Sequence, residues 1–376
     1  MTRGTQQVAA GSQSCNSRAR GARCTTAAAR PIVIAHRGAS GDAPEHTLAA
    51  YRIAIEQGAD YIEPDLVSTR DGVLIARHEN EIGGTTDVGR HAEFAARRTR
   101  KLIDGVPVEG WFSEDFTLAE IKRLRACERI PELRPANARR DGELEVPTLE
   151  EILALVRELE AERAAGARER GVPGVARIGI YPETKHPSYF AAARLALEPP
   201  LLEALRRFGY AGADAPIFIQ SFETGNLRAL RRITDLRLVQ LIEARGGPYG
   251  DRSTYAELTT SEGLAGIAGY ADAVGVAKSL ILPVGTDGAL GRPTRLIEDA
   301  HASGLDVHAW TFRAENAFLP PTLRSSADPA ARGEVGAEIA AFLAAGIDGF
   351  FIDQPGLGVR ARDEFLAISG AGRGGG

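Results

Sequence analysis

The sequence predicts an α/β protein: one closed (β/α)₈ TIM barrel with an inserted subdomain. After residue 31, eight short β-branched runs alternate with amphipathic stretches, the pattern of parallel βαβ units. One segment of about 70 residues breaks the alternation and is far longer than an ordinary loop. Without that segment and a polar N-terminal stretch, roughly 276 of the 376 residues remain, near the ~250 typical of such barrels.

The expected elements follow one another regularly along the chain. Strands are predicted at 31–36, 60–67, 176–183, 216–222, 236–242, 272–277, 305–312 and 348–353. Helices are predicted at 46–57, 148–163, near 188–208, at 224–233, near 255–268, at 293–304 and at 333–346. A doubly wound open sheet is the alternative, because alternation alone does not show that the sheet closes.

A hairpin follows the second strand. The run "GVLIARH" (72–78) comes after the turn "TRDG" alone, which is too short for a crossover, so it should run antiparallel. A two-residue turn, at Asp71-Gly72 or one residue earlier, would bring His78 opposite Asp65 or Glu63. The insertion, roughly 79–147, then begins at the far end of this arm.

Three segments are distinguished along the chain. Residues 1–30 are expected to be a disordered basic leader, since they are rich in Gly, Ser, Arg and Ala and carry five arginines but no acid. Residues 31–360 are expected to form the barrel, and residues 361–376 a flexible C-terminal tail.

Composition excludes several classes of protein. The chain is 44% hydrophobic and 25% charged, as in soluble globular proteins. Its formal charge is −5; because the leader carries five arginines and no acid, the remainder of the chain carries −5 − 5 = −10. A net-acidic body argues against nucleic-acid binding. No run is long enough for stable membrane insertion, and no secretory signal is readable, so the default location is cytoplasmic. The oligomeric state is left open.

Chemically active side chains fall at the carboxyl ends of the expected strands or just beyond them. The carboxyl ends of barrel strands carry the chemistry of this fold, because the loops there vary without disturbing the interior. The side chains that we expect to converge at this mouth are His36, Arg37, Glu63, Asp65, His78, Glu183 and Lys185.

The residue types in this cluster indicate phosphodiester cleavage. Three carboxylates without thiolates favour one divalent metal ion, Ca²⁺ or Mg²⁺ rather than zinc. Arg37 and Lys185 beside that ion would suit a phosphate. One histidine that takes a proton and another that gives one complete the minimum apparatus for the reaction.

The motifs resemble those of the glycerophosphodiester phosphodiesterase family. The resemblance starts with "AHRGASGDAPEHTLAAYRIAIEQGADYIEPDLVSTRDGVLIARHE", which holds His-Arg-Gly, Glu-x-Asp and a histidine-acid pair in order. It continues through "YPETKHP", "IQSFE", "LVQLI", "VHAWTFR" and "GIDGFFIDQP", to about Pro355. "PEHT" and the insertion resemble the larger, often exported branch, so a periplasmic or secreted location is the alternative.

The resemblance implies an activity and a role for each matching residue. Family members are metal-dependent barrels that hydrolyse glycerophosphodiesters, the deacylated phospholipids, to sn-glycerol 3-phosphate and an alcohol. The resemblance implies metal ligands at Glu63, Asp65 and Glu183, with Ca²⁺ favoured over Mg²⁺, and catalytic histidines at His36 and His78. It implies substrate contacts at Arg37, Lys185, Phe222 and Trp310. Glu79 departs from the pattern, which has Asp at that place.

Two other functions are weighed against this one. A related metal phosphodiesterase acting on intact or lyso-phospholipids would need an exposed apolar rim, for which "LILPVG" (280–285) with Phe318 and Leu319 is a weak candidate. A non-catalytic scaffold barrel should lack some of the expected ligands. None of them is missing from the sequence, so we rank the scaffold low.

Overall fold

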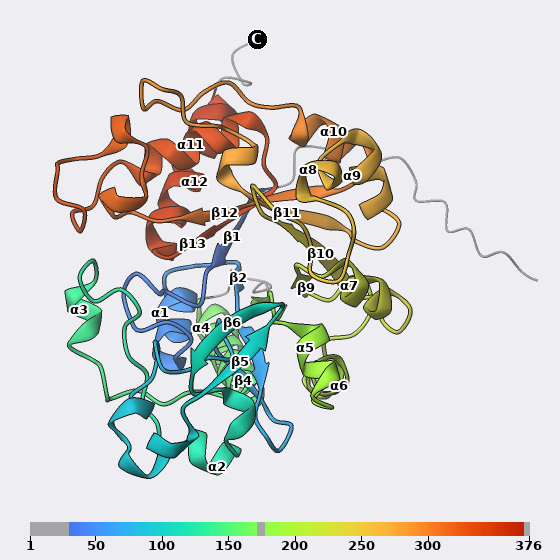
Figure 1. Cartoon of the computed structure of the whole chain (residues 1–376). Coiled ribbons are helices and arrows are strands. Elements are labelled where there is room, and N and C mark those ends of the chain that lie inside the picture. Colours follow the sequence, from blue (N-terminus) through green and yellow to red (C-terminus); the bar gives the residue numbers. More distant parts are fainter. Residues whose placement is uncertain (1–29, 171–176, 372–376) are drawn as a thin grey trace, which may run out of the picture.

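The computed structural model describes residues 30–170 and 177–371 (Figure 1). The predicted basic leader therefore lies outside the described residues, except for Arg30. Its guanidinium pairs with Asp60 at 3.1 Å on the surface of the barrel.

The sheet closes into a barrel, which confirms the predicted fold class. Its parallel strands are β1 (Ile32–Ala35), β2 (Tyr61–Ile62), β3 (Asp65–Ser68), β7 (Gly179–Ile180), β8 (Glu183–Thr184), β9 (Phe218–Ser221), β10 (Arg237–Ile242), β11 (Ala273–Ala277), β12 (Asp306–Phe312) and β13 (Gly349–Ile352). Strand β1 pairs with both β2 and β13, and the other pairings connect these two around the ring. No open edge therefore remains between the first and last strands of the ring.

Two of the eight predicted strands are interrupted by proline. Pro64 separates β2 from β3, and Pro182 separates β7 from β8. Proline has no N–H to donate to a neighbouring strand. The ladder continues across both breaks, because Glu183 N donates to Pro64 O at 3.0 Å and Gln220 N donates to Pro182 O at 2.9 Å. The two halves thus act as one strand in each case.

The helices cover the outside of the barrel (Figure 1). They are α1 (Leu48–Glu56), α4 (Leu149–Glu169), α5 (Pro187–Ala192), α6 (Glu198–Arg207), α7 (Thr224–Arg231), α8 (Tyr255–Leu258), α9 (Ser261–Ile267), α10 (Leu296–Ala302), α11 (Val335–Ala345) and α12 (Pro355–Ala371). Two predicted helices, near 188–208 and 255–268, are each split in two. Arg194, with φ of 61°, adopts a left-handed conformation that ends the first of these helices early.

The predicted flexible tail at 361–376 is wrong over 361–371. These residues continue helix α12, while 372–376 lie outside the described part of the chain. Ala361 and Arg362 are both buried, and the Arg362 guanidinium binds Asp60 and Asp363. The apolar periodicity failed to reveal this helix because a buried arginine occupies a core-facing position.

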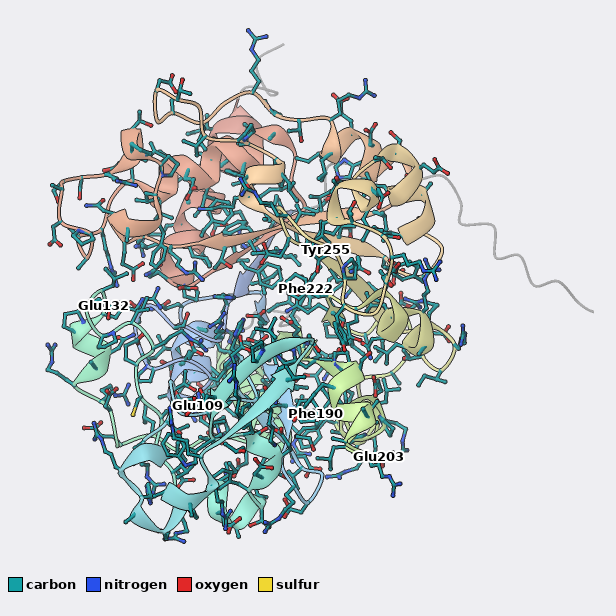
Figure 2. The ribbon with its side chains drawn as sticks, in the orientation of Figure 1. Glu109, Glu132, Phe190, Glu203, Phe222 and Tyr255 are labelled. Carbon is teal, nitrogen blue, oxygen red and sulfur yellow. The ribbon has the colours of Figure 1, made fainter. Side chains whose placement is uncertain are left out.

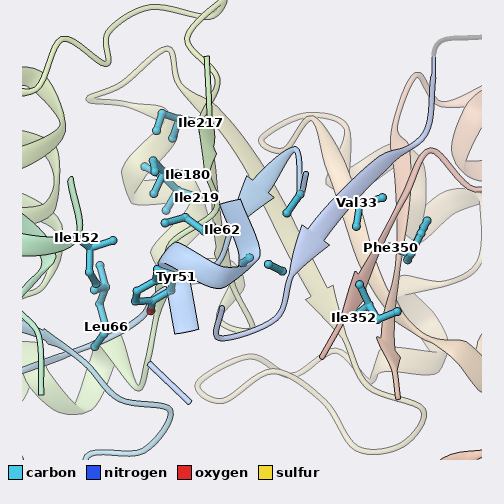
Figure 3. Close-up of a cluster of buried hydrophobic side chains, with 14 of the residues drawn as sticks. Val33, Tyr51, Ile62, Leu66, Ile152, Ile180, Ile217, Ile219, Phe350 and Ile352 are labelled. Atoms are coloured by element: carbon cyan, nitrogen blue, oxygen red, sulfur yellow. The ribbon is translucent and has the colours of Figure 1, made fainter. Parts of the chain in front are cut away.

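The core has two layers that follow the alternation of side chains along each strand. Val33 and Phe350 point outward to the helices, in the cluster that also contains Ile62 and Ile152 (Figure 3). The inner layer fills the barrel with Ile34, Tyr61, Tyr181, Phe218, Val239, Ala273 and Phe351. The barrel is therefore packed below its mouth, and ligands must enter at the carboxyl ends of the strands.

The hairpin register differs from both predicted registers. Strand β4 (Leu74–Ala76) is antiparallel to β3, as expected, but Leu66 faces Ala76 and Ser68 faces Leu74. A three-residue loop ending at Gly72, with φ of 79°, replaces the expected two-residue turn. The ladder therefore places Arg77, and not His78, beside Asp65.

The insertion leaves β4 and returns to α4. It contains the hairpin β5 (Thr99–Ile103) and β6 (Val106–Gly110), α2 (Leu118–Ile121), α3 (Pro135–Ala138) and short 3₁₀ turns at Val88–Arg90, Ala92–Arg97 and Ser113–Asp115. Thr117 and Glu120 form a capping box at the start of α2. Arg134 anchors the insertion to the barrel mouth, because its guanidinium binds Glu315 at 2.7 Å and Asp353 at 2.5 Å. Three further 3₁₀ turns lie at Lys278–Leu280, Asn316–Phe318 and Pro321–Leu323.

Candidate active site

A cavity of about 530 Å³ opens at the carboxyl ends of the barrel strands. Eight of the nine predicted site residues line it: His36, Arg37, Glu63, His78, Glu183, Lys185, Phe222 and Trp310. The ninth, Asp65, is 1% exposed and lies next to Glu183 across the β3–β8 pair. The structure thus brings together side chains that are up to 274 positions apart, from His36 to Trp310.

Three buried carboxylates form one cluster. Each of Glu63, Asp65 and Glu183 offers one oxygen, and these oxygens lie within 4.8 Å of one another. Asp65 Oδ1 is buried and has no hydrogen-bond partner among the described residues. Such a group of oxygen donors, one of them unpaired, could hold a hard divalent cation.

The electrostatics of the cluster also indicate a cation site. Burial, followed by the charges of Asp65 and Glu183, raises the pKa of Glu63 well above its ordinary value. Burial also raises the pKa of Glu183 to about 7, with Lys185 opposing and Asp65 reinforcing the shift. Like charges in a desolvated site resist joint ionisation, and a bound cation would relieve that repulsion.

Two cations flank the carboxylates. Lys185 Nζ lies 2.8 Å from Glu183 Oε1, and the Arg37 backbone N–H donates to Glu63 Oε2 at 2.9 Å. The Arg37 side chain donates from Nη1 to Glu45 Oε2 at 3.0 Å. Because both cations line the cavity, they are placed to contact a bound anion such as a phosphate.

His36 follows β1 and is fixed from behind by Asp353. Its Nδ1 lies 2.6 Å from Asp353 Oδ1, and its Nε2 lies 4.0 Å from Glu63 Oε2. Burial and the nearby charge of Arg37 lower the pKa of His36 to about 4, although Asp353 opposes the shift. At neutral pH the imidazole is therefore uncharged, and Nε2 is a proton acceptor at the cavity wall.

His78 lies beyond the end of β4, on the other side of Lys185. Its Nε2 is 3.4 Å from Lys185 Nζ, and its Nδ1 is 2.7 Å from Glu79 Oε1. Burial, then Arg37 and Lys185, lower the pKa of His78 well below its ordinary value. Glu79 also contacts His186 Nε2 at 3.1 Å, so the longer acid connects two histidines.

Sequence reasoning missed the residues that support this cluster. Gln220 Nε2 donates to Glu63 Oε1 at 2.7 Å, and His46 Nε2 lies 2.9 Å from Asp65 Oδ2. Glu45 binds both Arg37 and Arg129. These side chains lie within the quoted motifs "PEHT" and "IQSFE", but nothing in the apolar pattern separates them from ordinary loop and strand residues.

The structure also bears on membrane association. Among the described residues, no helix combines the length and the apolar character that a bilayer span requires.

Comparison with known proteins identifies the family. The model of the glycerophosphoryl diester phosphodiesterase family matches residues 36–357. A glycerophosphodiester phosphodiesterase of Arabidopsis thaliana is 37% identical over 303 residues, covering 77% of this chain and 76% of the relative. One of Haemophilus influenzae is 26% identical over 312 residues, covering 76% and 79%.

A solved structure shares the fold. An Oleispira antarctica phosphodiesterase, determined in complex with its product sn-glycerol 3-phosphate, superposes with a TM-score of 0.57 at 19% identity and covers 89% of this chain and 97% of its own. The family match extends over most of the chain and includes every predicted site residue. The chain therefore belongs to the glycerophosphoryl diester phosphodiesterase family and is a hydrolase of glycerophosphodiesters.

Proposed function

We propose that the protein hydrolyses glycerophosphodiesters in the cavity of about 530 Å³, with one bound Ca²⁺ and with His36 and His78 as the proton-transfer pair. The products are sn-glycerol 3-phosphate and the head-group alcohol. The observation that carries the proposal is the position of the two imidazoles. They line one cavity together with the buried carboxylates and two cations.

The carboxylates Glu63, Asp65 and Glu183 would hold the ion. All three residues offer carboxylate oxygens, and Asp65 Oδ1, which has no hydrogen-bond partner among the described residues, is available to bind the ion. We favour Ca²⁺ because it accepts many protein oxygens in flexible geometry, whereas Mg²⁺ retains several waters and demands a near-ideal octahedron. A bound divalent ion supplies Lewis-acid polarisation of the phosphoryl oxygens.

Arg37 and Lys185 would orient the phosphate and spread its developing negative charge. His36 Nε2 would take the proton of the nucleophile, which is either water or the glycerol 2-hydroxyl attacking within the molecule. His78 would give a proton to the departing alcohol. A phosphate bound between Arg37 and Lys185 offsets the charges that depress the pKa of His78, and so favours its protonated form.

An assay of choline release, with glycerol 3-phosphate measured in parallel, tests the proposal. Glycerophosphocholine and lysophosphatidylcholine would be compared with the purified chain, then after chelation, and then with Ca²⁺ or Mg²⁺ restored. We expect turnover of the glycerophosphodiester, loss with chelator and better recovery with Ca²⁺. Release of products only from the lysophospholipid would instead favour the lipid-directed phosphodiesterase. Activity unaffected by an exhaustive chelator would remove the metal from the proposal.

A further inference from the structure

A second cavity of about 590 Å³ adjoins the first. The two share Glu183, Lys185, Phe222 and Glu243 in their linings. The insertion supplies part of its wall, because Asp104 and Val106, at the β5–β6 turn, line it. A substrate bound at Lys185 can therefore extend from one cavity into the other.

The second cavity has more acids than cations. Asp104 pairs with His186 at 2.6 Å, and Glu183 pairs with Lys185 at 2.8 Å. Over residues 30–170 and 177–371, no lysine, arginine or histidine forms an ion pair with Glu223 or Glu243, which also line it. The lining thus has four carboxylates and two cations.

Of these two acids without an ion-pair partner, Glu243 is the one available to a cationic ligand. Glu223 is 4% exposed and accepts hydrogen bonds from the backbone N–H and the hydroxyl of Ser188, and burial raises its pKa. Glu243 follows the end of β10, is solvent-exposed and lines both cavities. A cationic ligand would give Glu243 the counter-charge that the described residues do not supply.

Aromatic rings line the same space. Phe222 and Tyr255 meet edge to face, with centroids 6.4 Å apart, and lie together near the centre of the molecule in Figure 2. Tyr249, 46% exposed, lines the outer part of the cavity. Aromatic faces attract ammonium groups. A quaternary ammonium group has no N–H to donate to a carboxylate, so contact with aromatic faces is its characteristic mode of recognition.

We propose that this second cavity binds the alcohol head group of the substrate and selects a cationic amino alcohol, of which a quaternary ammonium alcohol fits best. The inference rests on the proposed function, because it assigns the leaving group of that reaction. The position of His78 supports this placement of the leaving group: His78 lines the first cavity, and its Nε2 lies 3.4 Å from Nζ of Lys185, which lines both cavities. The glycerol side of the substrate then remains in the first cavity, beside Trp310.

The test compares two substrates that differ in head-group charge. Glycerophosphocholine has a quaternary ammonium, and glycerophosphoglycerol has an uncharged alcohol. We expect Glu243→Gln to lower kcat/KM about tenfold for glycerophosphocholine and less than twofold for glycerophosphoglycerol. Glu262→Gln is the matched control, because Glu262 is an exposed glutamate on α9 that lines neither cavity. It should change neither value.

Tetramethylammonium provides a second measurement that is independent of turnover. We expect it to compete with glycerophosphocholine and to bind the wild-type chain in calorimetry, with binding weakened at least fivefold by Glu243→Gln and by Tyr255→Leu. An equal loss of kcat/KM on both substrates, or no binding of tetramethylammonium, would overturn the head-group assignment and leave the hydrolase intact. Failure to hydrolyse either substrate would overturn the proposed function. In that case the binding of tetramethylammonium, or its absence, would by itself show whether the second cavity prefers a cationic ligand.

Discussion

Asp353 Oδ1 lies 2.6 Å from His36 Nδ1, although the two residues are 317 positions apart. Both follow directly on paired parallel strands, β13 and β1, so their side chains meet at the same edge of the barrel. A buried carboxylate with a strongly lowered pKa can only accept a hydrogen bond, so Nδ1 must hold the proton. The other nitrogen, Nε2, is then unprotonated, as the base role that we propose for His36 requires.

Replacing this carboxylate should therefore impair catalysis more than folding. We expect Asp353→Asn to reduce kcat by roughly 10²–10⁴-fold, since the amide can stabilise the wrong tautomer of His36. The measurement is steady-state kinetics alongside a thermal unfolding scan. Glu315→Gln is the control. Glu315 and Asp353 both bind the Arg134 guanidinium, but of these two carboxylates only Asp353 contacts His36. Equal losses in the two variants would assign the effect to the released arginine.

The assignment of His78 as acid predicts a dependence on the leaving group. We expect His78→Ala to lower kcat by about 10²–10⁴-fold on glycerophosphocholine, because choline departs poorly without a proton. The loss should be much smaller on the p-nitrophenyl diester of glycerol phosphate, whose leaving group needs no protonation. His36→Ala should impair both substrates alike. A His78→Ala variant that loses both activities equally would argue against the acid role.

His186 connects the insertion to the barrel and should make their contact sensitive to pH. Its Nδ1 lies 2.6 Å from Asp104 Oδ2 and its Nε2 lies 3.1 Å from Glu79 Oε2. Burial alone would lower its pKa, but the bonds to Asp104 and Glu79 raise the pKa to about 9. A raised pKa in the folded state stabilises the fold fully below about 6.5 and loses that contribution as pH rises through 9.

We expect stability to fall by on the order of 2 kcal/mol between pH 6.5 and 9.5 from this group, with amide exchange rising first in β5 and β6. His186→Gln should remove this part of the pH dependence. The measurement is hydrogen exchange with denaturant unfolding at each pH. A profile that is the same in wild type and in His186→Gln would contradict the assignment.

Tyr51 and His46 stabilise the acidic cluster through a chain of hydrogen bonds to Asp65. Tyr51 Oη lies 2.8 Å from His46 Nδ1, which leaves Nε2 to donate to Asp65. We expect Tyr51→Phe to lower the unfolding free energy by about 1–2 kcal/mol and to weaken the proposed binding of a divalent cation roughly tenfold, because the tautomer of His46 is no longer fixed. Calorimetric titration measures the affinity. Tyr210→Phe, a buried tyrosine outside the cavity lining, should leave the affinity unchanged.

The fold could be predicted because its signal is local. Alternating apolar runs identified all eight barrel strands, and the position of His36 and Glu183 at strand ends predicted that they converge, since parallel strands end at one edge. Prediction failed where local signals conflict. The hairpin register depended on whether Gly72 joins a two- or three-residue loop, and α12 was missed because Arg362 is buried.

The sequence by itself determined the barrel, its insertion and the residue types at its mouth, because periodicity and strand ends are properties of short segments. Only the tertiary structure decided which side chains support them: Asp353 behind His36, His46 beneath Asp65, and Asp104 against His186. Each of these contacts joins residues from separate elements. Hydrogen bonds of about 3 Å between such elements are set by how the closed barrel and its insertion pack, and no local pattern encodes them.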